Sequence, residues 1–153
     1  MDVKEALVII VSGFVGSLGF SLFFRMSKKK IPFTAIGGGL TCVVYVVCCV
    51  YFKNEFFQNL FPALFATAYA EVFARLTKTP STPYIVIAII PLVPGGKLYY
   101  TMYYFITSNN ELFHTSLVQT VRIAGGLAVG IIIVSVIIRE INYSKFKHFY
   151  DTE

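Results

Sequence analysis

Charged residues are scarce in this sequence. Asp, Glu, Lys and Arg together make up 14% of its 153 residues, whereas 56% are hydrophobic and the mean hydropathy is +0.71. A soluble globular domain usually carries about 25% charged residues and has a lower apolar share. The shortage of charge therefore excludes an ordinary soluble protein and indicates an integral membrane protein.

Residue patterns for catalysis and metal binding are also lacking. Cys42, Cys48 and Cys49 lie in one apolar run with no histidine nearby, so we expect free buried thiols rather than disulfides or a zinc site. His114 and His148 have no acidic or cysteine partners in the pattern of a triad or a metal centre. The sequence therefore predicts neither an enzyme nor a bound cofactor.

Five apolar runs dominate the chain, each close to the ~20 residues that cross a bilayer as a helix. They lie at about 6–24, 33–52, 56–76, 84–106 and 117–138. We expect an all-α, multi-pass protein of the cell (inner or cytoplasmic) membrane. Residues 1–153 would form a single five-span domain surrounded by lipid, and 139–153 would be a short cytoplasmic tail.

The net charge of +5 comes from basic residues that lie mostly on one side of the membrane. Most basic residues lie in the first loop, the third loop and the tail: Arg25, Lys28, Lys29, Lys30, Arg75, Lys78, Arg139, Lys145 and Lys147. The other side has Lys4 and Lys53, and the loop at 108–116 has no Lys or Arg. The positive-inside rule then places the N-terminus outside and the C-terminus in the cytoplasm. Topology accounts for the basic charge, so no nucleic-acid partner is predicted.

Small residues form stripes in the first and last runs. Gly13, Gly16 and Gly19 recur in the first, and Gly126 and Gly130 are spaced by four in the last. Such stripes allow helix backbones to approach closely in lipid. We interpret them as packing surfaces rather than as a substrate lining.

The fourth run is interrupted between Pro91 and Gly96. Pro91 and Pro94 each remove a backbone donor, and Gly95 and Gly96 make a continuous helix improbable. In a bilayer, the freed backbone groups must be satisfied by protein or by a water-filled cavity. A second half-helix that restarts near Gly95 would direct free N–H groups into the break, which is an arrangement that transporters use to hold a substrate carboxylate.

Two cations are predicted at the depth of this break. Helix rise places Lys97 ~21 Å into a ~30 Å core and Arg122 at a similar level. Their partner would be a substrate anion, a carboxylate of another subunit or cavity water, although Arg122 could instead extend to the membrane surface. Tyr99 and Tyr100 follow, either as hydroxyl donors to substrate or as part of an interfacial aromatic belt.

Glu71 and Arg75 are spaced to share one face at the cytoplasmic end of the third run. They would form either a local ion pair or a coupling and gating site. By the same depth arithmetic, Glu71 lies ~9 Å from the cytoplasmic face and is too far away to neutralise the cations at the break.

Residues 70–102, AEVFARLTKTPSTPYIVIAIIPLVPGGKLYYTM, resemble the threonine/serine exporter family in its small-subunit form. The similarity centres on the Ala-Glu and Ala-Arg helix end and on the core "IPLVPG" followed by Tyr and Met. The family's motif positions are occupied by Pro91, Pro94, Gly95, Tyr99, Glu71 and Arg75. Lys97 departs from the family's pattern, in which small residues are usual.

The resemblance implies secondary export of small carboxylates, either amino acids such as threonine and serine or a dicarboxylate such as succinate. It also implies that this chain corresponds to the second five-span half of fused members and works with a second five-span subunit. Self-association is a further expectation. The competing hypothesis is a non-transporting scaffold or regulatory subunit, in which the broken span is only a structural kink.

Overall fold

The computed structural model describes the backbone of residues 2–150 and the side chains of residues 2–141, and this part of the chain is all-helical. Its elements are α1 (Val3–Phe23), α2 (Ile31–Tyr51), α3 (Glu55–Leu76), α4 (Thr82–Ile89), the 3-10 turn η1 (Ile90–Leu92), α5 (Gly95–Ile106) and α6 (Asn110–Tyr150). The predicted all-α class is therefore confirmed. The predicted runs match these helices to within a few residues, except at α6.

Among the described residues, three helices are long and apolar enough to cross a membrane, namely α1, α2 and α6. The segments Thr82–Leu92 and Gly95–Ile106 pass the same test only together, as one span bent by 58°. The predicted break in the fourth run is thus confirmed, and the structure identifies up to four spans. The remaining predicted span corresponds to α3, which has the length but a more polar composition.

The polar composition of α3 follows from its place in the bundle. This helix packs against α2, α4 and α6, and its buried positions are Asn59, Pro62, Ala63, Ala66, Thr67, Ala70 and Ala74. A helix that contacts protein on several sides needs less apolar surface than one that faces lipid. Exposed large apolar side chains are fewer on α3 than on each of α1, α2, α5 and α6.

Helix α6 begins earlier and ends later than the predicted run at 117–138. It starts at Asn110, so most of the segment 108–116, which we expected to be a loop, is helical. Asn109 caps this start by accepting a hydrogen bond from the backbone N–H of Leu112 at 3.4 Å. The early start is also supported by packing, because the rings of Phe105 on α5 and Phe113 on α6 lie against each other with their centroids 5.4 Å apart and a tilt of 49°.

Small residues join α3 to α6 in the centre of the bundle. A Cβ atom built on Gly126 would lie 2.4 Å from the backbone oxygen of Phe56, and one on Gly130 would lie 2.7 Å from Cβ of Ala63. The predicted packing role of this pair is confirmed. The two contacts show that α3 and α6 run in the same direction, with the start of α3 beside Gly126.

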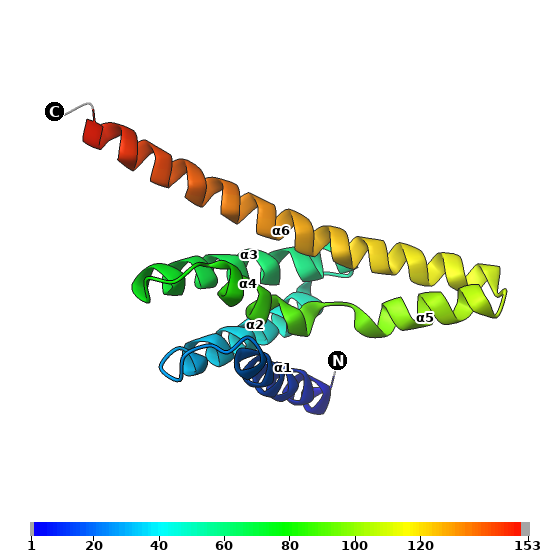
Figure 1. The fold of residues 1–153 in the computed structure, drawn as a ribbon. Helices are drawn as coiled ribbons and strands as arrows, with labels where there is room; N and C mark the ends of the chain where they lie inside the picture. Colours follow the sequence, from blue (N-terminus) through cyan, green and yellow to red (C-terminus); the bar gives the residue numbers. More distant parts are fainter. Residues whose placement is uncertain (1, 151–153) are drawn as a thin grey trace.

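The α5–α6 hairpin extends past the other helices (Figure 1). Because Gly126 lies beside the start of α3, residues 110–125 of α6 continue beyond that start for about 24 Å at ~1.5 Å per residue. Helix α5 packs along this part of α6, whereas α4 packs against α2 and α3. The broken span therefore leaves the bundle at its break.

Only part of the small-residue stripe of α1 is a packing surface. Gly13, Ser17 and Ser21 are buried, and a Cβ on Gly13 would overlap Sγ of Cys42 on α2. Gly16 and Gly19 have open space where a Cβ would be, so their predicted packing role is wrong. Repeated steps of three turn around the helix by about 60° in one sense, whereas steps of four turn by about 40° in the other. Gly16 and Gly19 therefore move away from the buried positions Gly13, Ser17 and Ser21.

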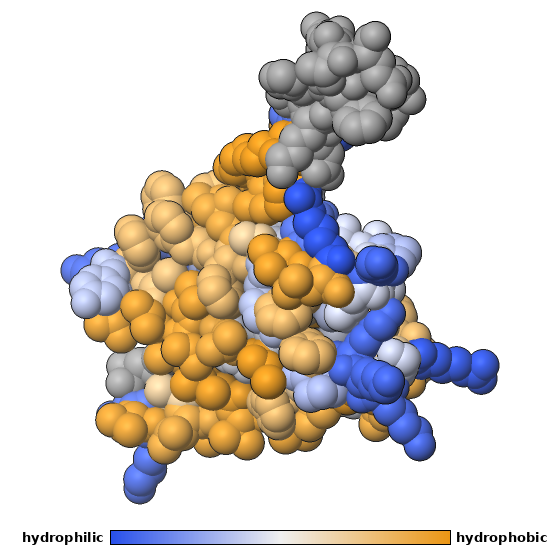
Figure 2. All heavy atoms as spheres, turned by 90° about the vertical axis from the view of Figure 1, so that its left-hand side faces the viewer, coloured by the Kyte–Doolittle hydropathy of each residue, from blue (hydrophilic) through white to orange (hydrophobic). Residues whose placement is uncertain are grey.

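The opposite end of the bundle carries basic turns. Figure 2 views the molecule from this end and shows long hydrophilic side chains at the margins of a largely apolar surface. Beneath it, Lys30 Nζ donates a hydrogen bond to Thr79, and the hydroxyls of Thr77 and Tyr84 lie 3.0 Å apart. These bonds tie the α1–α2 turn to the α3–α4 turn. All three cysteines are free, as predicted, and Cys42 and Cys48 are buried.

A buried hydroxyl satisfies a carbonyl that the break leaves free. Pro91 has no N–H, so the carbonyl of Ile87, four residues earlier, lacks its helical partner. Ser17 Oγ of α1 donates to this oxygen at 3.3 Å, and Ser17 is fully buried. For this carbonyl the partner is a protein hydroxyl, which is one of the two alternatives that the sequence left open.

Ser17→Ala should leave the Ile87 carbonyl buried without a donor. We expect a loss of about 1–3 kcal/mol in unfolding free energy, which is the usual cost of such a group. Thermal unfolding of the purified protein in detergent measures the loss. Ser12→Ala, at an exposed position on the same helix, is the control. Equal stability of the two variants would contradict the assignment.

Candidate functional site

Helix α5 restarts at Gly95, as the sequence predicts. Pro94 is its N-cap, the N–H of Gly95 donates to the Val93 carbonyl at 2.7 Å, and the N–H of Leu98 donates to Pro94 at 2.9 Å. The N–H groups of Gly96 and Lys97 lie between these two, in the first turn, where a helix supplies no acceptor. The N-terminus of α5 therefore presents free donors and the positive end of its dipole to the break.

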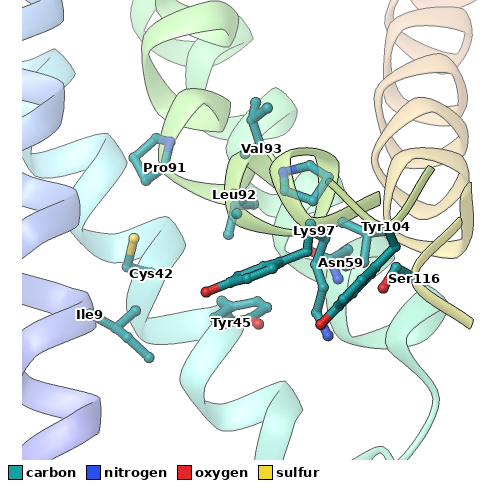
Figure 3. Close-up of a pocket in the computed structure, with 15 residues that line it drawn as sticks. Ile9, Cys42, Tyr45, Asn59, Pro91, Leu92, Val93, Lys97, Tyr104 and Ser116 are labelled. Carbon is teal, nitrogen blue, oxygen red and sulfur yellow. The ribbon is translucent and has the colours of Figure 1, made fainter. Parts of the chain in front are cut away.

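A pocket of about 600 Å³ opens at this N-terminus (Figure 3). Its wall combines the break with side chains from α1, α2, α3 and α6. The lining residues are Ile9, Cys42, Tyr45, Asn59, Pro91, Leu92, Val93, Pro94, Gly95, Gly96, Lys97, Tyr100, Tyr104, Ser116 and Ile123. In the close-up, Lys97, Tyr104 and Ser116 lie on one side, and Ile9 and Cys42 lie on the other.

The pocket lies nearer one end of the bundle than its centre. Ile9 is six residues from the start of α1, and Asn59 is four residues from the start of α3. At ~1.5 Å per residue these positions are about 9 Å and 6 Å from the helix starts. A substrate could therefore reach the pocket from this end without crossing the packed core.

Six of the predicted substrate-binding residues line the pocket: Pro91, Pro94, Gly95, Gly96, Lys97 and Tyr100. Tyr99 and Arg122 are not among the lining residues. The Tyr99 side chain is 66% exposed on the outer face of α5, and Arg122 is exposed on α6. These positions suit the alternatives that the sequence left open, an aromatic belt for Tyr99 and surface contact for Arg122.

Glu71 and Arg75 lie far from this pocket. Glu71 is half-buried and Arg75 is exposed near the other end of α3. Twelve residues separate Glu71 from Asn59, which corresponds to about 18 Å along the helix. The structure therefore does not bring the predicted coupling pair together with the predicted substrate site.

The ammonium group of Lys97 has a neutral partner. Its Nζ donates a hydrogen bond to Oε1 of Gln119 at 2.6 Å, which joins α5 to α6. Sequence reasoning expected an anion or water beside this cation and did not identify Gln119. Because the Gln119 amide is neutral, this contact does not offset the positive charge of Lys97.

Several lining residues were not predicted as part of a site, notably Tyr45 and Asn59. Asn59 is 3% exposed, and its Nδ2 donates to the Glu55 carbonyl at 2.8 Å. An amide inside a membrane-length apolar run is unusual and could have drawn attention to this position. One turn earlier, Oε2 of Glu55 is buried and has no hydrogen-bond partner within residues 2–141.

The side chains that line the pocket carry one positive charge, whereas the carboxylate of Glu55 lies one helical turn outside the lining, before Asn59. Lys97 is the cation among the lining residues, and no Asp or Glu is found among those that the structure describes. The free amides at the start of α5 add to the same potential. Tyr45, Asn59, Tyr100, Tyr104 and Ser116 supply further polar atoms in the lining.

These features define a class of protein. Apolar helices of membrane length indicate a multi-pass membrane protein, and a substrate pocket at a discontinuous helix is a common arrangement in secondary transporters. The family model described as "Threonine/Serine exporter, ThrE" matches residues 9–137. The chain therefore belongs to the threonine/serine exporter family, which is a family of membrane transporters. The searches of curated proteins and of solved structures find no match.

The matched range includes every residue that lines the pocket, because the lining extends from Ile9 to Ile123. It also includes the break and the whole of α5. The candidate site thus lies within the part of the chain that defines the family.

Proposed function

We propose that this chain is a subunit of a secondary exporter whose substrate carboxylate binds at the start of α5. The observation that carries the proposal is the convergence of free helix N-terminal amides and Lys97 on one pocket. A carboxylate placed there would accept hydrogen bonds from the amides of Gly96 and Lys97 and would pair with the ammonium group.

The two glycines at the start of α5 leave room for this ligand. A Cβ atom built on Gly95 or Gly96 has no neighbour within 4 Å. Both residues have ordinary negative φ angles, so neither backbone conformation nor packing requires glycine here. The open space is instead suited to close approach of a ligand to the backbone.

The lining favours a dicarboxylate over a zwitterionic amino acid. A carboxylate of either substrate could bind Lys97, but the ammonium group of threonine or serine would find no carboxylate partner in the lining described here. A second carboxylate, as in succinate, could instead accept bonds from hydroxyl and amide groups such as Tyr45 and Asn59. We therefore propose a small dicarboxylate as the preferred substrate.

In this proposal α3 also crosses the membrane, which brings the number of spans to five. The N-terminus is outside, and the basic turns lie on the cytoplasmic side of the inner cell membrane. Export would be driven by the proton gradient or by the substrate gradient. If protons are coupled, Glu71 remains a candidate at the cytoplasmic end of α3. Its distance from the pocket would require coupling through helix movement rather than direct contact.

The projecting α5–α6 hairpin supports the proposal of a second five-span subunit. Leu98, Met102 and Ile106 on α5 remain exposed in the part of the chain whose side chains the structure describes. Self-association through the same surface is the alternative. Co-purification tests whether the second subunit binds this surface. The wild-type chain is compared with a variant in which residues 98–106 are replaced by polar ones.

Transport of labelled succinate, threonine and serine by membrane vesicles tests the function. We expect succinate flux in vesicles that contain this chain and its partner subunit, with weaker flux of the amino acids. Gly96→Val should reduce flux about tenfold or more, because it fills the space at the helix start with a β-branched side chain. Gly19→Val, which also enters open space, is the matched control.

Absence of flux for all three substrates would favour a scaffold with a structural kink. Flux of threonine without flux of succinate would retain the exporter and overturn the proposed substrate preference.

A further inference from the structure

The hydrogen bond between Lys97 and Gln119 holds the pocket's cation from the neighbouring helix. Gln119 is half-buried on α6 and does not line the pocket, whereas Lys97 does. One of the three N–H donors of the ammonium group is directed to Oε1 of Gln119 at 2.6 Å. Two donors remain for a ligand.

Gln119 is not required to join the two helices. One turn further along α5, Thr101 and Thr120 are buried with their hydroxyl oxygens 3.3 Å apart. Each hydroxyl has a single O–H, which donates either to the other hydroxyl or to a carbonyl of its own helix, Thr101 to Lys97 and Thr120 to Ser116, both at 2.8 Å. Phe105 and Phe113 hold the far end of the hairpin. The interface between α5 and α6 therefore has contacts that do not involve Gln119.

The neutral charge of Gln119 matters for the pocket. A carboxylate at this place would hold Lys97 equally well by hydrogen bonding, but it would cancel the positive charge. A lysine with no acceptor would keep its charge but lose its fixed position, because its side chain has many rotamers. An amide oxygen positions the ammonium group and leaves the charge available.

We propose that Gln119 is a specificity-determining positioning residue, which fixes Lys97 at the pocket while keeping the pocket positive, and so selects anionic substrates over zwitterions. This inference rests on the proposed function. It adds a second residue to carboxylate recognition, one that acts through Lys97 rather than on the substrate.

Gln119→Glu tests the inference, because it changes charge with almost no change in shape. Using vesicles with the full chain and its partner, we expect the KM for succinate to rise about tenfold or more, with little change in the maximal rate. The KM for threonine should change less, so the preference for succinate should fall. Asn110→Asp adds the same charge to the same helix at an exposed position and should alter neither KM.

A second variant separates positioning from charge. Gln119→Met removes the acceptor without adding charge, so it should raise the KM for both substrates while the preference for succinate persists. Thermal unfolding of each variant checks that the fold is retained. If Gln119→Glu does not fold, Gln119→Met still tests the positioning role, and an unchanged KM in that variant would overturn it.

The outcome distinguishes this inference from the proposed function. If Lys97→Ala removes succinate transport but Gln119→Glu leaves both the KM and the preference unchanged, the role of Gln119 is overturned and the carboxylate site remains. If Lys97→Ala also has no effect, the carboxylate site itself is wrong.

Discussion

Lys97→Glu is expected to reduce succinate transport at least ~100-fold. The substitution removes an attraction between the ammonium group and the substrate and replaces it with repulsion between two carboxylates. If each of these changes costs about 1.4 kcal/mol, which corresponds to a factor of ten, the two together account for the expected loss. The effect should exceed that of Lys97→Ala, because alanine only removes the attraction. Initial rates in vesicles measure both variants.

Lys53→Glu is the matched control for this charge reversal. Lys53 is exposed in the turn between α2 and α3, outside the pocket lining. Because exposed charges are screened by solvent and salt, its reversal should change flux little. Equal losses in the two variants would mean that Lys97 acts through the overall surface charge rather than at a binding site.

Gly126→Ala is expected to destabilise the bundle by about 3 kcal/mol, at the upper end of the usual cost of overpacking. The new methyl group would lie 2.4 Å from the Phe56 carbonyl oxygen and 3.3 Å from the Leu60 nitrogen. Both are backbone atoms, so relief requires α3 and α6 to move apart. Because α3 also packs against α2 and α4, the movement would affect the centre of the bundle.

Gly125→Ala provides the closest comparison with this variant. A Cβ at Gly125 would contact the Phe56 ring at 3.7 Å, which is an ordinary van der Waals distance. Thermal unfolding in detergent and the amount of protein in the membrane should therefore change for Gly126→Ala and stay near wild type for Gly125→Ala. Similar behaviour of the two variants would contradict close α3–α6 packing through Gly126.

Local sequence patterns are sufficient to predict the break and every helix except the bounds of α6. Apolar runs of membrane length located α1 and α2 because hydrophobic length is a direct requirement of the bilayer. The break between Pro91 and Gly96 was equally predictable, since proline removes a donor wherever it stands in a helix. The restart of α5 at Gly95 followed from the same argument.

Contacts between helices were less predictable. Gln119 was missed because its bond to Lys97 depends on the register of α5 against α6, which no local pattern encodes. Asn59 and Tyr45 enter the pocket from helices distant in sequence. Gly16 and Gly19 show the same limit, because a small residue reveals nothing about which helix face meets a neighbour.

The predicted depths of Lys97 and Arg122 assume that every span is a straight helix that crosses the bilayer core along one axis. The 58° bend of the fourth span and the projection of the α5–α6 hairpin do not fit that assumption. The place of the pocket follows instead from where its lining residues lie along each helix. They lie close to the start of α1 and the start of α3.

Equilibrium binding of succinate to the purified protein tests the carboxylate site most directly, because it does not depend on coupling or turnover. Calorimetric titration of the wild-type complex should give a Kd that Lys97→Ala raises about tenfold or more and that Lys53→Ala leaves unchanged. Succinamide, which has the same carbon skeleton without charge, should not bind. Succinate binding that is equally tight in Lys97→Ala and in the wild type would contradict a carboxylate site at the start of α5.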